Sequence, residues 1–337
     1  MTATLRVVAP GPLTTLQDGG RQGWLRFGVP GSGALDPRAL AAANLLVGNP
    51  RETGALEMAL AGGTFAAEGV MRIALAGADM AMTIAGAPAA RERSHTLASG
   101  AVVAIGAARS GARAYLAASG GFAVAPVFGS VATHLRAGIG GFDGRALRAG
   151  DAIPVAGPVP AGPDLLLAAA PPPTHPCLRV VLGPQDDYFT AAALALLCAG
   201  TFTVTAQSDR MGYRLAGPAL EHARGFNIVS DGIAPGSIQV PGNGQPIILL
   251  ADRQTTGGYP KIATVISADL PALGQMRPGD AVRFAAVGLA DAVAARRALM
   301  AWIEELPRRI VPLAGLPDTE RLLGTNLISG VTDGSTA

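Results

Sequence analysis

Polar residues that could do chemistry gather in a few glycine-rich loops of an otherwise apolar chain. The densest of these loops, residues 252–261, contains a carboxylate (Asp252), a phenol (Tyr259) and the only lysine of the chain, Lys261. It follows the apolar run 247–250, so we expect it to emerge from the end of a buried strand. A chain that otherwise uses arginine would keep a lysine by chance or where it needs a compact ammonium group, as a clamp for a carboxylate or carboxyphosphate-like group or as a buried base. We predict Lys261, Asp252 and Tyr259 to be catalytic.

Other loops offer groups suited to holding a substrate. Residues 14–21 combine an amide, a carboxylate and a guanidinium with two adjacent glycines, which let a backbone approach a ligand closely. Residues 208–214 contain an acid, a tyrosine and two arginines that could grip a carboxylate together. In both loops the alternative is a purely structural role, in which the acid and an arginine form an ion pair that stabilises the turn. The predicted substrate-binding residues are Gln17, Asp18, Arg21, Asp209, Arg210, Tyr213, Arg214, Gln239, Arg253 and Gln254.

Several familiar kinds of site are not predicted. Residues 28–36 form a glycine-rich loop before a helix, but they lack the phosphate-binding patterns of nucleotide sites, and Asp36 reads as a helix cap. Cys177 and Cys198 fit no zinc or redox spacing, and the four histidines are isolated, so we predict no metal site. No nucleophile elbow or hydrolytic triad is evident.

The loops must be held by a mostly β framework. Short β-like runs bounded by Gly, Pro, Asp or Ser predict strands at 71–76, 80–84, 102–105, 112–117, 178–182, 202–205, 247–250, 263–266 and 281–284. Three helices are predicted, at 36–48, 186–200 and 289–306. The turn-plus-strand sequence LRAGDAI at 147–153 resembles MRPGDAV at 276–282 and, more weakly, LASGAV at 97–102, which hints at two related β-barrels.

Length and composition indicate a mainly β protein of two barrel-type sub-domains with a few short helices. The chain has 337 residues, 49% of them hydrophobic and 15% charged, enough to build two cores. A proline-rich stretch separates the halves. We predict an N-terminal sub-domain at 1–165, a linker at 166–176, a C-terminal barrel at 177–306 and a loosely ordered tail at 307–337.

The same features restrict the partners and the compartment. A net charge of +2 without a basic run gives no nucleic-acid footprint. The N-terminus lacks the pattern of a signal peptide, and no apolar run is long enough to span a membrane, so we expect no membrane association. Two cysteines suit a reducing compartment, and we predict a cytoplasmic protein.

Taken in order, the loops resemble the allophanate hydrolase subunit 2 family, also described as biotin-dependent carboxyltransferase subdomain proteins, which includes KipA-like proteins and the C subunit of 5-oxoprolinase. The resemblance covers roughly residues 5–290. The matching stretches are GPLTTLQDGGR at 11–21, GVPGSGALD at 28–36, ANLLVGN at 43–49 with Glu57, GSVAT at 129–133, SDRMGYRL at 208–215, GSIQVPGNGQP at 236–246 and DRQTTGGYPK at 252–261.

The resemblance implies a cyclophilin-like β-barrel, at least in the second half, and a heteromeric complex with a KipI-like B subunit and an A subunit of the same enzyme. It implies ATP-dependent opening of 5-oxoproline to glutamate, with a small polar amide or carboxylate as substrate and ATP used by the complex. Alternatives are a carboxyltransferase component acting on urea or a related amide, with carboxybiotin from a partner, and a KipA-like regulatory binding protein. Lys261 does not lie in a biotin-carrier motif, so we predict no biotinyl-lysine and no covalently bound cofactor in this chain. We expect the loops to converge on a groove between the barrels or at a partner interface.

Overall fold

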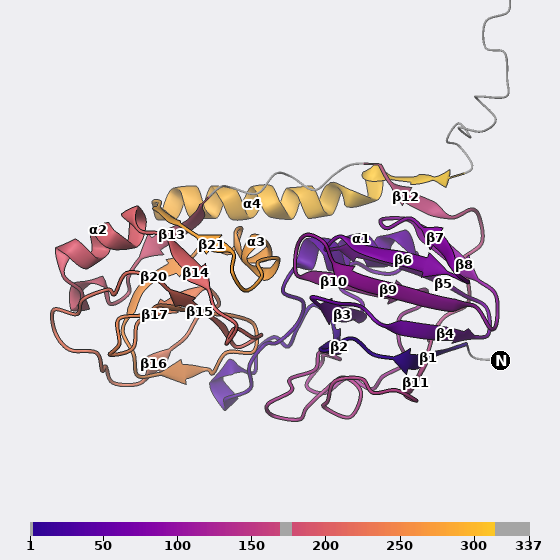
Figure 1. Cartoon of the computed structure of the whole chain (residues 1–337), viewed down its shortest axis with the longest axis horizontal. Coiled ribbons are helices and arrows are strands. Elements are labelled where there is room, and N and C mark those ends of the chain that lie inside the picture. The colour runs from indigo at the N-terminus through magenta and orange to yellow at the C-terminus, as the bar shows by residue number, and fades with distance from the viewer. Residues whose placement is uncertain (1–2, 169–176, 314–337) are drawn as a thin grey trace, which may run out of the picture.

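A computed structural model describes residues 3–168 and 177–313 of the chain. The N-terminal half packs two antiparallel sheets face to face (Figure 1). The first sheet has the order β11 (Ala152–Pro154), β1 (Thr4–Ala9), β4 (Thr64–Glu68), β9 (Val102–Ala108), β6 (Met80–Ile84) and β7 (Ala87–Ala89). The second has the order β2 (Thr14–Gln17), β3 (Ala55–Ala59), β10 (Arg113–Ala118), β5 (Met71–Gly77) and β8 (Ser94–Leu97). One core of aliphatic side chains fills the space between them.

Helix α1 (Pro37–Leu46) covers the outer face of the second sheet. Asp36 caps it by accepting hydrogen bonds from the backbone N–H groups of Arg38 and Ala39, and Pro37 occupies the first turn, as the sequence predicts. Because the sheet has the core on one face and α1 on the other, all six residues of β10 are buried. A strand buried on both faces can hold charged side chains only where they find partners.

The C-terminal half is an eight-stranded sheet in the order β21 (Ala281–Val282), β14 (Phe202–Val204), β15 (Gly212–Ala216), β18 (Ile247–Leu249), β17 (Ser237–Gln239), β20 (Lys261–Val265), β13 (Leu178–Leu182) and β22 (Phe284–Ala286). The two edge strands, β21 and β22, are consecutive in the chain and separated only by Arg283. A single stretch of chain therefore joins both edges, and the sheet nearly closes into a barrel. The prediction of a mainly β fold with a barrel in the second half is confirmed, whereas the N-terminal core lies between two separate sheets.

Small elements decorate the barrel. Helix α2 (Ala191–Ala199) follows the 3-10 turn η2 (Asp186–Tyr188), and together they account for the helix predicted at 186–200. A fourth α-helix, the five-residue α3 (Leu270–Gly274), was not predicted, and neither was the 3-10 turn η1 (Leu25–Phe27). The strands β16 (Asp231–Gly232) and β19 (Thr256–Gly257) pair as a separate two-stranded ribbon.

The C-terminal segment ties the two halves together. Helix α4 (Leu289–Glu305) runs across both sub-domains in Figure 1, and its buried residues Leu299 and Ile303 join the core formed by α1. The 3-10 turn η3 (Leu306–Arg309) leads into β23 (Ile310–Pro312), which pairs with β12 (Leu165–Leu167). Residues 307–313, which the sequence places in a loosely ordered tail, instead form the end of η3 and the strand β23, whose pairing with β12 satisfies the backbone of 310–312. The rest of that tail, and residues 169–176 of the predicted linker, lie outside the described residues.

The repeated turn of the two halves has one geometry. Gly150 and Gly279 both adopt a left-handed backbone, with φ of 91° and 94°. The next residue in each copy, Asp151 or Asp280, accepts a hydrogen bond from the backbone N–H three residues before it. Each turn leads into an edge strand, β11 or β21, as the sequence predicts.

Candidate functional site

One face of the second sheet supplies the N-terminal half of the site. In the pairing of β2, β3 and β10, Glu57 lies opposite Thr15 on one side and Tyr115 on the other. Because alternate residues of a strand share a face, Gln17 and Arg113 belong to this face as well. The side chains of Gln17, Glu57 and Arg113 are all buried. This polar row within apolar strands faces the C-terminal half of the chain.

Two loops of the barrel supply the other half. Arg210 sits in a turn held by Asp209, whose side chain accepts hydrogen bonds from the backbone N–H groups of Met211 and Gly212. Asp252 follows β18, which pairs with the strand that begins two residues after Arg210. The backbone N–H of Asp252 donates to the carbonyl oxygen of Arg210 at 3.0 Å, so the two loops are joined directly.

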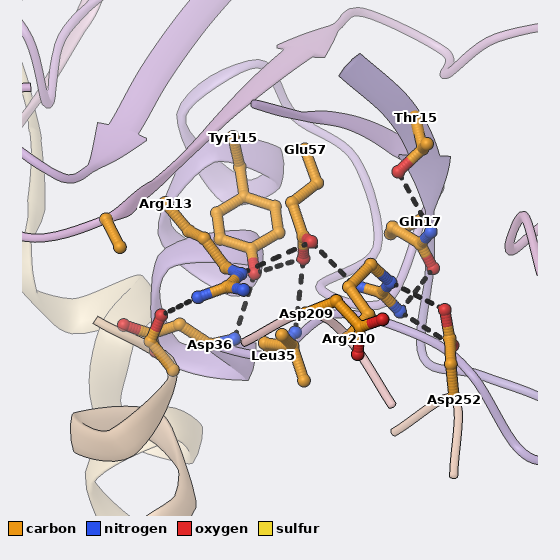
Figure 2. Close-up of polar contacts among 12 residues, drawn as sticks. Thr15, Gln17, Leu35, Asp36, Glu57, Arg113, Tyr115, Asp209, Arg210 and Asp252 are labelled. Atoms are coloured by element: carbon orange, nitrogen blue, oxygen red, sulfur yellow. Dashed lines mark hydrogen bonds and ion pairs between the residues drawn. The ribbon is translucent and has the colours of Figure 1, made fainter. Parts of the chain in front are cut away.

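The guanidinium of Arg210 connects both halves (Figure 2). It donates to both carboxylate oxygens of Asp252, at 2.9 and 3.1 Å. It also reaches across the boundary between the two halves, which we call the seam. There it donates to Glu57 Oε1 at 2.5 Å, to Gln17 Oε1 at 3.1 Å and to the carbonyl oxygen of Gly33 at 2.7 Å. Its nitrogens are thereby committed to protein oxygens, so Arg210 positions the site and has little capacity left to bind a substrate.

Glu57 is held as an anion. Its Oε2 accepts from the Tyr115 hydroxyl at 2.6 Å and from the backbone N–H of Leu35 at 3.2 Å, and Arg113 Nε lies 3.7 Å from Oε1. Burial alone would raise the pKa of Glu57, but the charges of Arg210 and Arg113 and the two neutral donors outweigh burial and lower this pKa below its ordinary value. A carboxylate saturated by donors is a poor base. Glu57 is therefore the buried negative charge that Arg210 and Arg113 neutralise, and it is poorly suited to act as a base.

A cavity of about 460 Å³ opens at this seam, and we call it the seam cavity. Residues from both halves line it, among them Glu57, Arg113, His134, Arg210 and Asp252. The His134 Nδ1 accepts from a backbone N–H, which leaves Nε2 as the protonated nitrogen facing the Asp252 carbonyl oxygen at 3.3 Å. The Nε of Arg113 is buried and has no hydrogen-bond partner in the part of the chain that the structure describes.

The rim of the seam cavity carries exposed charge. Arg136 and Asp209 both line the cavity and both are exposed. No carboxylate of residues 3–168 or 177–313 lies within 4.0 Å of the Arg136 guanidinium, which donates a hydrogen bond to the sulfur of Met211 at 3.2 Å. The rim thus offers a free cation to an anionic group of a ligand.

Lys261 lies in a different polar cluster. Its side chain is buried, and its Nζ forms an ion pair with Asp231 of β16 at 2.8 Å. Gln239 pairs with Lys261 across β17 and β20, and its side-chain amide donates to the carbonyl oxygen of Tyr259. Gln254 lies at the same ribbon, close to Gly257, and like Tyr259 it is exposed. The structure therefore does not bring Lys261 and Tyr259 together with Asp252 in the seam cavity.

Three other predicted residues line a second cavity, and Arg214 lines neither. Asp18, Arg21 and Arg253 border a cavity of about 760 Å³ between the halves, on the side of α4, which we call the helix-side cavity. Arg214 is exposed on β15 and does not join Arg210, which turns into the seam. The predicted two-arginine grip is therefore wrong, because a residue in the turn and one in the strand point their side chains to different surroundings.

The residues that complete the seam were missed among the predicted site residues. Glu57, Arg113 and Tyr115 lie in strands and not in loops. A signal was present, since a charged residue inside an apolar strand is rarely buried without a partner. Gln275 was missed too, although its side chain bonds to Asp36 and to the backbone of Arg113 across the seam. Within the described ranges no group of three potential ligands could hold a metal ion, and no helix there has the length and hydropathy of a membrane span.

Comparisons with known proteins agree with this architecture. The chain is 38% identical to the C subunit of 5-oxoprolinase from Haemophilus influenzae over 88% of its length and 95% of that protein. It is 37% identical to the C subunit of 5-oxoprolinase from Escherichia coli over 91% of its length and 98% of that protein. The crystal structure of the K. lactis urea amidolyase superposes with a TM-score of 0.83 and 29% identity, and the match covers 94% of this chain and 20% of that one.

The family itself follows from a match over most of the chain. Residues 27–286 match the family described as carboxyltransferase domain, subdomain A and B. The matched region includes the strands of both N-terminal sheets except β1 and β2, and the whole C-terminal barrel, so Glu57, Arg113, Arg210 and Asp252 lie within it. The chain therefore belongs to the carboxyltransferase domain family, as a protein with both subdomains A and B.

Proposed function

We propose that this chain is the C subunit of an ATP-dependent 5-oxoprolinase, which opens 5-oxoproline to glutamate together with an A subunit and a KipI-like B subunit. The observation that carries this proposal is the nearly full-length likeness to two bacterial proteins of that name. Urea amidolyase, in contrast, is a much longer chain of which this protein matches only a fifth.

The seam cavity is the proposed substrate site. 5-Oxoproline is a small lactam with one carboxylate, and the cavity combines an apolar lining with guanidinium groups at its floor and rim. We assign the substrate carboxylate to Arg136, which is exposed and free of a carboxylate partner among the described residues. Arg113, with its unpaired Nε, would meet negative charge that develops on the lactam oxygen.

The chemistry divides between this chain and its partners. ATP would phosphorylate the lactam oxygen and leave as ADP. Attack of one water at the activated carbon would then break the C–N bond and leave that carbon as an acyl phosphate, and a second water would hydrolyse the acyl phosphate to glutamate and phosphate. ATP use by the complex is part of the proposal, and we expect the ATP site on another protein of the complex. Lys261 is poorly placed to carry biotin, because its Nζ is buried and paired with Asp231.

Carboxyl transfer is the second candidate function. It is favoured by the superposition of 94% of this chain on the K. lactis urea amidolyase. In that case carboxybiotin would come from another chain, and urea or a related amide would accept the carboxyl group at the seam cavity. The ionised Glu57 and the Arg210 network would hold the two subdomains in register for either reaction.

The direct test is reconstitution. Co-purify the chain with its candidate A and B partners, supply 5-oxoproline and ATP, and measure glutamate release with each of the three proteins omitted in turn. We expect release that requires this chain. A stable three-protein complex without activity would contradict the proposal and favour carboxyl transfer, for which urea and a biotinylated partner are the first reagents to test.

A further inference from the structure

The helix-side cavity contains two buried guanidinium groups that form no ion pair with a carboxylate of the described chain. Arg253, which is 3% exposed, donates from Nε to the carbonyl oxygen of Ile233 at 2.9 Å and from Nη1 to that of Leu250 at 3.3 Å. No carboxylate in residues 3–168 or 177–313 lies within 4.0 Å of its guanidinium. Burial lowers the pKa of Arg253 to about 10. A buried guanidinium without an anion is an unusual feature, because its desolvation is not compensated.

Arg21 is a second such group in the same cavity. It is 2% exposed, and it donates to the carbonyl oxygens of Val127 and Ala132 from Nε and Nη2. Its Nη1 is buried without a hydrogen-bond partner among the described residues. Burial lowers the pKa of Arg21 despite the charges of Asp18 and Asp252 nearby. The guanidinium therefore keeps an unused donor.

A hydroxyl and its loop complete the set of unused donors. Ser32 Oγ is buried without a partner in the described chain, and Ser32 lines the cavity. Its backbone is left-handed, with φ of 52°, between Gly31 and Gly33. Gly33 approaches Gly20 so closely that a Cβ on Gly33 would lie 2.8 Å from the Gly20 backbone. The glycines thus let two loops close one wall of the cavity.

The acids that line this cavity are already engaged. Asp18 accepts from the backbone N–H groups of Gly20 and Val131 and from the Ser130 hydroxyl. Glu52 is exposed and lies 3.7 Å from Arg51. Neither carboxylate forms an ion pair with Arg21 or Arg253. A direct ion-pair partner for either arginine therefore has to be an anion that these residues do not supply.

We propose that the helix-side cavity binds a small carboxylate with an apolar body, with Arg253 as the ion-pair partner of the carboxylate. Its apolar wall comes from both halves and from α4, and includes Leu40, Leu250, Leu270 and Met300. The helix-side cavity and the seam cavity are lined by different residues. The site is independent of the 5-oxoprolinase proposal and needs no partner protein to be tested.

The test uses the purified full chain with hexanoate as the probe and hexanamide as its neutral match. Titrate both by calorimetry, and follow the arginine Nε–H resonances by NMR. We expect saturable binding of hexanoate with a shift of the Arg253 resonance, and neither effect with hexanamide. Arg253→Met should weaken hexanoate binding about tenfold or more, because a charge-assisted hydrogen bond is lost. Arg296→Met should change it by less than about threefold, because this arginine lines the same cavity but is exposed.

Defined outcomes would overturn the proposal. If hexanamide binds as tightly as hexanoate, the carboxylate charge does not contribute to binding. If a folded Arg253→Met variant binds hexanoate with unchanged affinity, Arg253 is not the ion-pair partner of the carboxylate. Inorganic phosphate is the third probe, and phosphate that binds more tightly than hexanoate would make the site a phosphate site. If Arg253→Met fails to fold, the comparison of the two probes on the natural chain still decides, since absence of saturable hexanoate binding up to about 10 mM contradicts the proposal.

Discussion

Replacing Arg210 with methionine should destabilise the seam at its centre. Arg210 is the counter-charge of two buried carboxylates, Glu57 and Asp252, which are 2% and 5% exposed. Removing one partner of a buried ion pair costs about 3–5 kcal/mol, because the other charge stays buried without compensation. Here Asp252 loses its partner and Glu57 loses the nearer of its two, Arg113 at 3.7 Å being the other, so we expect a loss of about 5 kcal/mol in the free energy of unfolding. That is a large part of the stability of an ordinary domain.

The pKa of Glu57 determines how the loss of stability in the Arg210→Met variant should change with pH. In the natural chain the pKa of Glu57 is lowered, so the unfolded state binds a proton first as the pH falls, and the stabilisation is present above the ordinary value of 4.5 and lost below it. Without Arg210, burial is opposed only by Arg113, Tyr115 and Leu35, and the pKa of Glu57 should rise. The variant should therefore lose more stability at pH 7 than at pH 4.

The assay is urea unfolding of the natural chain and the variants across this pH range. Arg210→Lys keeps the charge but cannot form the paired bonds to Asp252, so we expect a smaller loss of about 1–3 kcal/mol with the pH trend of the natural chain. Adding Glu57→Gln to Arg210→Met should recover part of the loss. A loss below about 1 kcal/mol, or one independent of pH, would refute the view that Arg210 neutralises the seam.

Three further changes probe the site and its framework. Arg136→Gln should raise KM for 5-oxoproline in the reconstituted enzyme about 10-fold or more, whereas Arg214→Gln, an exposed arginine outside the seam cavity, should leave it unchanged; equal effects would contradict the assignment. Lys261→Ala tests the catalytic role predicted from the sequence; because Lys261 pairs with Asp231 outside the seam cavity, we expect little change in kcat, and a large loss of kcat in a folded variant would contradict this expectation. Gly140→Ala should cost several kcal/mol in thermal unfolding, because a Cβ there would lie 2.1 Å from a backbone oxygen. Gly138→Ala has a similar φ of 63° but open space around it, and should cost about 1 kcal/mol.

Local patterns were sufficient for many of the elements. The cap and proline at Asp36 and Pro37 mark the start of α1 at the correct residue. The apolar run 71–76 predicts β5, because strand formation in a core depends on a short run bounded by turn residues. These apolar runs do not specify which strands pair with one another. The closure of the barrel through β21 and β22 depends on contacts between residues about a hundred positions apart.

The site divides in the same way. Gln17, Arg210 and Asp252 were predicted from their loops, and the structure joins all three in one hydrogen-bond network. Lys261 was predicted with them because it is close to Asp252 in the sequence. The strand β20 instead carries Lys261 to the ribbon, where Asp231 neutralises it.

By itself the sequence determined the mainly β character, the positions of nine runs that form strands and of the three longer helices, and the loops that are rich in polar groups. These depend on residue type and on neighbours a few positions away. The tertiary structure alone decided that Glu57 and Arg210, 153 positions apart, share one buried ion pair, and that Arg253 remains without one among the described residues. The physical reason is that the charge state and role of a buried group depend on the partners that folding places within a few ångströms, and no local pattern records them.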